Sequence, residues 1–178
     1  MPKSIHFSGT NDGLRQAIED RLVRAGASIS EEPQGADMKI GLGTDLECDI
    51  AVLPPGSDSD RADLVVRLCD VIIPNGGRDW GTGTLLDWVD QVKHGLEPQT
   101  GSDSRYWVNV RDVADALATL ALGRDGLAFS GRVNMCGRRG WRDEDVVDEI
   151  RDLWERYNNA VNHSHTVDSL SGVPSPVR

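Results

Sequence analysis

The segment Arg105-Tyr-Trp-Val-Asn-Val-Arg-Asp-Val-Ala-Asp-Ala-Leu117 joins a short β-like run to an alanine-rich helix. An arginine and two aromatic residues precede the strand pattern, and Asp112 stands where the helix is expected to open. An acidic side chain in the first helical turn interacts favourably with the N-terminal helix dipole. The segment therefore predicts a strand-to-helix junction, with the helix over residues 112–122.

The remainder of the chain alternates between strand and helix patterns. Apolar residues at helical spacing predict helices over residues 14–25, 84–94 and 143–157. Short apolar runs between Gly, Pro and Asp predict strands over residues 4–8, 27–30, 38–42, 49–53, 64–66, 71–73 and 132–135. This alternation predicts an α/β fold with a mainly parallel sheet. We expect one domain over residues 1–157 and a polar, flexible tail over residues 158–178.

Composition excludes several classes of protein. With 29 acidic against 19 basic residues, the net charge of −10 argues against a nucleic-acid partner, which would need a basic face. No apolar run is long enough to span a membrane and no signal-peptide pattern opens the chain, so we expect a cytoplasmic protein. Cys48, Cys69 and Cys136 lie far apart without a C-x-x-C pair, and we interpret them as small buried hydrophobes. The histidines show no metal-ligand spacing, so no metal site is predicted.

Two blocks resemble a known family. The segment 105–117 resembles the R-D-F/W-V-H-V-x-D-V-A-x-A segment of the extended short-chain dehydrogenase/reductases, the NAD-dependent epimerase/dehydratase family. Arg132-Val-Asn-Met-Cys-Gly137 resembles that family's G-x-x-Y-N-I-G strand, with Asn134 and Gly137 matching. Matching blocks cover residues 4–157. The resemblance implies a Rossmann-like three-layer α/β fold with a mainly parallel sheet, internally truncated, and NAD(P) as the ancestral cofactor.

The dinucleotide-binding turn departs from the family pattern. The chain has Ser8-Gly-Thr-Asn-Asp-Gly-Leu-Arg15 where the family has T-G-G-x-G-F-L-G. Gly9 keeps the first glycine, but Asp12 and Arg15 replace the other two. A carboxylate repels a pyrophosphate unless Arg15 compensates, so NAD(P) binding is predicted to be weak or lost. In the alternative interpretation, the turn is only a strand-turn-helix corner. The candidate cofactor-binding residues are Gly9, Thr10, Asp12 and Gly13.

The family's redox motif is absent. That motif is Y-x-x-x-K, in which the lysine lowers the pKa of the catalytic tyrosine. Tyr106 and Tyr157 are followed four positions later by Val110 and Val161, and no lysine follows Lys93. Hydride transfer of the usual kind is therefore not expected, the catalytic residues are unknown, and whether the chain is an enzyme stays open.

An internal deletion accounts for the missing motif. Cys48–Pro54 resembles the family's D-V-V-I-H-L-A strand, and Val65–Pro74 resembles its later V-x-L-R-x-x-N-V-Y-G-P strand. The elements that carry the catalytic Ser/Thr, Tyr and Lys should lie between these two strands. Arg67 keeps the strand arginine, whereas Asp70 replaces the family's asparagine.

Four residues are candidates for a substrate site. The family uses the counterpart of Arg105 on the nucleotide diphosphate, where a forked guanidinium suits phosphate oxygens. Trp80 lies in a Gly-rich segment, residues 75–84, and is a candidate for contact with a ligand or partner. Alternatively, Arg105 forms a structural salt bridge and Asp112 is only a helix-capping residue. The candidate substrate-binding residues are Arg105, Asp70, Trp80 and Asn134.

Two functions remain open from the sequence. One is an enzyme of nucleotide-sugar or secondary metabolism that works without the Tyr/Lys redox chemistry, with a site rebuilt around Arg105, Asp70 and Trp80. The other is a non-catalytic module that binds a small anionic or nucleotide ligand, or a partner. Loss of sheet-covering elements should expose apolar surface, so we expect a homo-oligomer, a dimer, or pairing with a full-length relative.

Overall fold

The computed structural model describes residues 2–74, 80–123 and 130–163. The helices are α1 (Gly13–Arg24), α2 (Thr82–Lys93), α3 (Val110–Leu122) and α4 (Asp143–His163). The strands are β1 (Ser4–Gly9), β2 (Ser28–Ser30), β3 (Met38–Leu42), β4 (Cys48–Leu53), β5 (Ala62–Leu68), β6 (Val71–Ile72), β7 (Ser104–Arg105), β8 (Val108–Asn109), β9 (Gly131–Met135) and β10 (Trp141–Arg142). The chain divides into two compact units: Met1–Leu86 with Ser104–Trp141, and Asp87–Asp103 with Arg142–Arg178.

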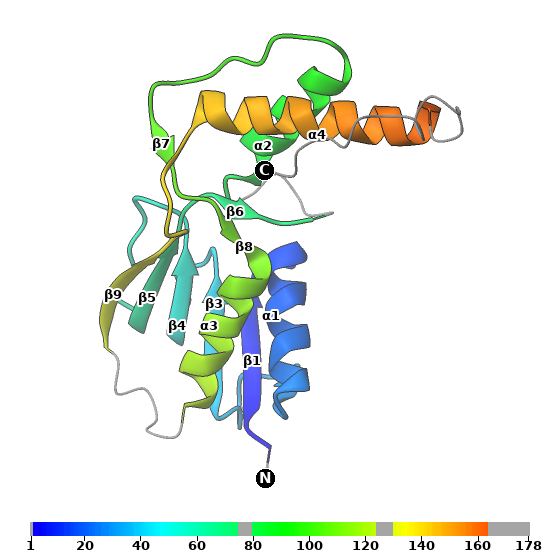
Figure 1. Cartoon of the computed structure of the whole chain (residues 1–178). Coiled ribbons are helices and arrows are strands. Elements are labelled where there is room, and N and C mark those ends of the chain that lie inside the picture. Colours follow the sequence, from blue (N-terminus) through cyan, green and yellow to red (C-terminus); the bar gives the residue numbers. More distant parts are fainter. Residues whose placement is uncertain (1, 75–79, 124–129, 164–178) are drawn as a thin grey trace. The chain divides into compact units, whose positions relative to one another are not determined.

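The first unit is built on a six-stranded parallel sheet. The strand order is β2-β1-β3-β4-β5-β9, and every neighbouring pair is parallel (Figure 1). From β1 the chain passes through α1 to β2 on one side and then returns to β3 on the other side of β1. Such a reversal leaves a crevice at the carboxyl ends of the two strands, where α/β proteins usually bind ligands. The predicted parallel α/β fold is confirmed.

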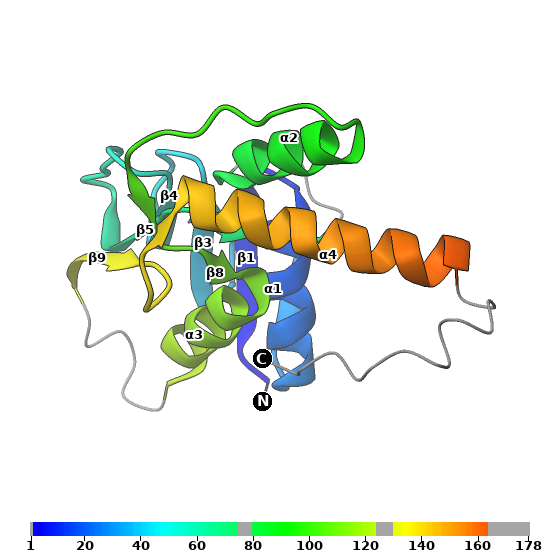
Figure 2. The same cartoon turned by 45° about the horizontal axis from the view of Figure 1, so that its top comes forward.

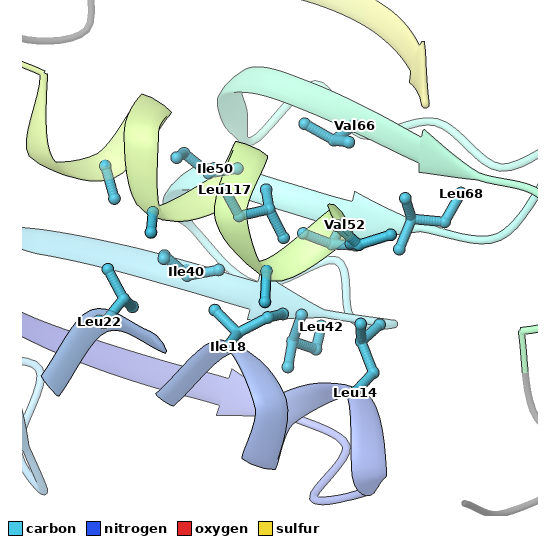
Figure 3. Close-up of a cluster of buried hydrophobic side chains, with 14 of the residues drawn as sticks. Leu14, Ile18, Leu22, Ile40, Leu42, Ile50, Val52, Val66, Leu68 and Leu117 are labelled. Atoms are coloured by element: carbon cyan, nitrogen blue, oxygen red, sulfur yellow. The ribbon is translucent and has the colours of Figure 1, made fainter. Parts of the chain in front are cut away.

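The main core lies between the sheet and two helices. Helices α1 and α3 lie side by side on one face of the sheet, as Figures 1 and 2 both show. Leu14, Ile18 and Leu22 of α1 recur at helical spacing and point toward the strands (Figure 3). They meet alternate residues of the strands and Leu117 of α3 in one buried cluster, a contact that stabilises this layer by removing apolar surface from water. The strand residues labelled in this cluster are Ile40, Leu42, Ile50, Val52, Val66 and Leu68.

Loops cover part of the opposite face of the sheet. Ala51 and Val65 are fully buried in a second, smaller cluster that contains no helical residue. Strands β3 and β4 are joined by residues 43–47, and β4 and β5 by residues 54–61, without helices. Parallel strands are usually joined by helical crossovers, so the third layer is reduced to loops in this part of the fold. The premise that the deletion leaves the sheet uncovered is wrong at these residues.

The second unit contains α4, the last part of α2 and the segment after it. The carboxylate of Asp143 accepts a hydrogen bond from the backbone N–H of Gly101 at 3.0 Å. Arg151 forms an ion pair with Glu97 at 2.6 Å. Lys93 places its ammonium group 5.6 Å from the ring centroid of Trp154, within the range of a cation–π contact. These contacts hold the segment to α4 within the unit.

Element boundaries differ from expectation at two helices. Helix α3 begins at Val110 because the side chain of Asn109 caps it and accepts a hydrogen bond from the N–H of Arg111. Asp112 therefore lies in the first turn and is not the cap. Helix α4 continues to His163, so residues 158–163 are helical where a tail was predicted. The predicted turn at residues 74–77 and the tail beyond 163 fall largely outside the described residues.

Candidate functional site

The turn after β1 packs against β3. Gly9 has φ of +91°, and a Cβ atom at this position would overlap the carbonyl oxygen of Leu42. The backbone N–H of Thr10 donates a hydrogen bond to that same oxygen at 3.0 Å. Gly9 is thus required by the contact between its own turn and β3, and this requirement involves no ligand.

Asp12 uses both of its carboxylate oxygens within the protein. Oδ1 accepts a hydrogen bond from the backbone N–H of Arg15 at 3.0 Å, which makes Asp12 the N-cap of α1. Oδ2 accepts a hydrogen bond from the indole Nε1 of Trp80 at 2.8 Å. Helix N-termini attract anions because their first N–H groups lack partners inside the helix. In this chain the anion at the N-terminus of α1 is the Asp12 carboxylate itself.

Trp80 is a core residue in the structure. The residue is 8% exposed and belongs to the main buried cluster, and its backbone is left-handed with φ of +58°. The carbonyl oxygen of Trp80 accepts a hydrogen bond from the N–H of Val71 at 2.8 Å. A left-handed backbone is costly for a large side chain and persists only where surrounding contacts maintain it. The backbone hydrogen bond with Val71 and the side-chain hydrogen bond to Asp12 together hold the indole beside the dinucleotide turn.

Arg15 does not offset the charge of Asp12 in this arrangement. Its Nε lies 2.6 Å from Oε1 of Glu19, one turn further along α1. Its guanidinium also lies 5.5 Å from the ring centroid of Phe7. Arg15, which the sequence offered as a cation to compensate Asp12, is therefore paired with Glu19 of its own helix.

A second set of polar residues gathers where β5 and β9 end. The residues after β5, before β8 and after β9 meet there and line a cleft of about 510 Å³. Carboxyl ends of parallel strands are the usual location of ligand sites in α/β folds. The lining residues are Pro55, Gly56, Arg67, Cys69, Asp70, Ser104, Tyr106, Asn134 and Cys136.

Asp70 lines this cleft and binds the segment that precedes α3. Its Oδ2 accepts a hydrogen bond from the backbone N–H of Tyr106 at 3.3 Å, and its backbone carbonyl accepts one from Val108 at 3.0 Å. The carbonyl oxygen of Tyr106 in turn accepts a hydrogen bond from the N–H of Gly137 at 2.9 Å. A Cβ atom at Gly137 would overlap the backbone of Trp107, so only glycine permits this approach. Three distant segments are therefore joined by backbone contacts.

Arg105 lies beside Asp70. Its Nη1 is 3.2 Å from Oδ1 of Asp70, and its guanidinium is 5.9 Å from the ring centroid of Trp107. Both members of the ion pair are partly buried, with side chains 30% and 17% exposed. The structure thus brings Arg105 to the edge of the cleft with its charge matched by Asp70.

The loop over residues 54–61 forms the other wall of the cleft. Arg67 donates from Nε to the carbonyl oxygen of Ser57 at 2.8 Å and pairs with Asp58 at 3.0 Å. Arg132 donates to both carboxylate oxygens of Asp58 at 2.7 and 2.8 Å, and also pairs with Asp60 at 2.9 Å. The hydrogen bond from Arg132 holds the pKa of the Asp58 carboxyl below its ordinary range. Arg67 of β5 and Arg132 of β9 thus both bind this loop and hold it against the two strands.

The predicted substrate residues fall into two places. Asp70 and Asn134 line the cleft, with Arg105 beside them, whereas Trp80 lies at the dinucleotide turn. Tyr106, Ser104 and the two cysteines of the cleft were not among the predicted site residues. Cys136 directly follows a predicted strand, but the pairing of β5 with β9 that brings Cys69 to the same cleft had no local sequence signal. Among the described residues, no group of three His, Cys, Asp or Glu side chains could hold a metal ion.

Comparison with known proteins supports the fold. No family model matches the chain, and no curated protein matches its sequence. Among solved structures, an NAD-dependent epimerase/dehydratase, so described, from Methylobacillus flagellatus matches with a TM-score of 0.53. The match covers 85% of this chain and 81% of that one at 8% sequence identity. The Rossmann-like fold implied by the resemblance is therefore confirmed, and the similarity is one of fold.

Within residues 2–74, 80–123 and 130–163, no helix combines the length and apolar character needed to cross a bilayer.

Proposed function

We propose that this chain is a cytoplasmic, non-catalytic binding protein that keeps the epimerase/dehydratase fold without using NAD(P). Its ligand site is the cleft at the ends of β5 and β9. The observation that carries the proposal is the double engagement of Asp12, which caps α1 and accepts the indole N–H of Trp80. The residues at the turn do not fit a dinucleotide.

Electrostatics and space both support this conclusion. A pyrophosphate at the turn would have to approach a carboxylate that already occupies the N-terminus of α1. Like charges at contact distance repel strongly, and the nearby cation Arg15 is paired with Glu19. The buried indole of Trp80 lies beside the same turn and would also oppose a pyrophosphate there sterically.

The lining of the cleft suits a small polar ligand. Asn134 is exposed there and offers an amide donor and acceptor, while Ser104 and Tyr106 offer hydroxyl groups. The charges of Arg67 and Arg105 are matched by Asp58 and Asp70. Hydrogen bonding to hydroxyl or phosphate groups is the chemistry available, so we infer a sugar-containing or nucleotide ligand.

Calorimetry with NAD⁺, NADH, NADP⁺ and NADPH tests the first part of the proposal. We expect no heat of binding at micromolar protein concentration. The Asp12→Gly variant removes the competing carboxylate and serves as the comparison. Tight binding of any dinucleotide by the wild-type protein would refute the proposal.

A thermal-shift screen with nucleotides, sugar phosphates and nucleotide sugars tests the second part. A ligand that stabilises the wild-type protein should stabilise Asn134→Ala less, because that side chain lines the cleft. Asn162→Ala, an asparagine replacement on α4, is the matched control and should retain the full shift. Equal shifts in both variants would place the ligand elsewhere.

An enzyme acting on nucleotide sugars without hydride transfer is the second candidate. It is favoured by the convergence of Asp70, Tyr106 and Asn134 at the carboxyl edge of the sheet, where α/β enzymes hold their substrates. Incubation with nucleotide sugars in the absence of dinucleotide, followed by NMR, would reveal turnover. Unchanged substrate spectra would leave the binding proposal as the better one.

We also propose self-association through α4. Leu153, Tyr157 and Val161 follow one another at intervals of four positions on this helix and are 53%, 58% and 58% exposed. Clustered exposed apolar side chains commonly mark a protein interface. A second copy of the chain, related by a twofold axis, is the simplest partner for such a stripe.

A further inference from the structure

Cys69 and Cys136 are neighbours in the tertiary structure although 67 positions separate their numbers (136 − 69). Strands β5 and β9 are parallel and in register through Leu68↔Met135. Each cysteine is the next residue after that pair. Continuation of the register therefore places the two cysteines opposite one another.

Side-chain alternation puts both sulfur atoms on the same side of the sheet. Leu68 and Met135 point toward the helix layer, where both contact the main core cluster. The pair before them, Arg67↔Asn134, lines the cleft on the other side. Successive residues of a strand point to opposite faces, so the pair after them returns to the cleft. Both cysteines do line it.

The spacing suits a covalent bond between the two residues. Neighbouring strands lie about 4.8 Å apart, and disulfides form when the Cα atoms are roughly 4.4–6.8 Å apart. Both thiols are free in this structure, Cys136 exposed and Cys69 half-buried. We propose that Cys69 and Cys136 are a redox-active dithiol that exchanges with low-molecular-weight disulfides and closes into an intramolecular disulfide between β5 and β9.

The exchange proceeds in two balanced steps. The Cys136 thiolate attacks one sulfur of a disulfide RSSR, forming a mixed disulfide and releasing RS⁻, which takes up a proton from water. The Cys69 thiol then loses its proton and attacks the Cys136 sulfur, expelling the second RS⁻. In sum the protein dithiol loses two protons and two electrons, and RSSR is reduced to two RSH. Excess thiol reverses both steps.

Exposure sets the order of attack. Cys136 is open to solvent, whereas burial, with the nearby Asp70 charge and Cys136, raises the pKa of the Cys69 thiol. Cys69 is therefore the poorer nucleophile toward a molecule in solution and acts on the adjacent mixed disulfide. In a reducing compartment such a pair would cycle between states, as intracellular disulfides commonly do.

The test uses the reduced full-length protein incubated with oxidised glutathione and analysed by mass spectrometry under non-reducing conditions. The wild-type protein should fall from three free thiols to one, with no retained glutathione. Proteolytic mapping should join the peptides that contain Cys69 and Cys136. This mapping needs no variant, so it stands even if a substitution affects folding.

Three single variants test the role of each cysteine in the two steps. Cys69→Ser should accumulate a stable glutathione adduct at Cys136 at a rate near that of the wild-type first step. Cys136→Ser should react several-fold more slowly. Cys48→Ser, which removes the buried third cysteine, should form the disulfide normally and retain no free thiol.

Several outcomes would overturn the proposal. These are a stable glutathione adduct on the wild-type protein, a disulfide that includes Cys48, a disulfide between two chains, or three unreacted thiols. None of them bears on dinucleotide or sugar binding, so the test is independent of the proposed function.

Discussion

The indole nitrogen of Trp80 donates a hydrogen bond to the carboxylate of Asp12 at 2.8 Å across 68 positions of sequence. The same carboxylate caps α1, so one side chain joins the helix start to the core. In a dinucleotide-binding fold this place is kept clear by glycine to let a pyrophosphate approach the helix. The contact makes the turn after β1 part of the packed structure.

Loss of the Trp80 hydrogen bond should weaken the fold. Trp80→Phe keeps an aromatic ring but leaves Oδ2 of Asp12 without this donor. We expect the free energy of unfolding to fall by about 2 kcal/mol, the usual range for hydrogen bonds to charged groups. Urea denaturation measures the change. Asp12→Ser, which keeps a capping oxygen, should cost less than Asp12→Ala. Additive losses in the Asp12→Ala/Trp80→Phe double variant would show that the two residues are not coupled.

Gly9 should be far less replaceable than a glycine with a similar backbone and open surroundings. Gly9→Ala adds a Cβ atom against Leu42, whereas Gly35 has φ of +84° and nothing within 4 Å of the added atom. We expect a loss of roughly 3 kcal/mol for Gly9→Ala and about 1 kcal/mol for Gly35→Ala. Thermal or urea unfolding of both variants gives the comparison. Equal losses would show that backbone conformation alone requires glycine at position 9.

Arg105 should contribute to stability through Asp70. Arg105→Ala removes a partly buried ion pair and a contact with Trp107, so we expect a loss of about 1 kcal/mol in urea unfolding. Arg105→Lys should lose less because it keeps the charge. If either variant abolished ligand binding with unchanged stability, Arg105 would belong to the ligand site as first predicted.

The Arg132–Asp58 pair should make the free energy of unfolding depend on pH. Because the folded-state pKa of Asp58 is lowered, its contribution is present above the unfolded value of about 4 and is lost as the pH falls through the folded value. The difference in urea midpoint between wild type and Arg132→Ala should therefore be present at neutral pH and shrink in acid. A constant difference across this range would assign the effect of Arg132 to packing.

Light scattering tests self-association. We expect a dimer at micromolar concentration and a shift toward monomer in Leu153→Ser/Tyr157→Ser. Leu46→Ser is the matched control, because Leu46 is similarly exposed in the other compact unit. A monomeric wild-type protein would refute dimerisation, and a dimer unaffected by the α4 changes would move the interface elsewhere.

Sequence patterns predicted the elements and fold class because local spacing encodes them. Leu14, Ile18 and Leu22 share one face of any helix, and short apolar runs such as Met38–Leu42 suit buried strands. Boundaries were less predictable. Asn109 competes with Asp112 for the cap of α3, and a side-chain hydrogen bond decides between them.

The candidate site was only partly predictable. Asp70 and Asn134 were expected from family-like motifs and do line one cleft. Trp80 was expected at a ligand surface because its segment is rich in glycine, yet it is buried. The three cysteines were interpreted as small buried hydrophobes; this is correct for Cys48 and wrong for Cys69, which is half-buried, and for Cys136, which is exposed. Their separation in sequence gave no indication that β5 and β9 pair beside them.

The sequence by itself determined the order of strands and helices, the parallel sheet and the loss of the Tyr/Lys motif, since each follows from local periodicity or residue identity. Only the tertiary structure decided that Trp80 reaches Asp12, that Ala51 and Val65 are buried, and that Cys69 and Cys136 line one cleft. These relationships depend on which distant segments pair and in which register. That choice is made by packing of the whole sheet, where a shift of one residue would send every side chain to the opposite face.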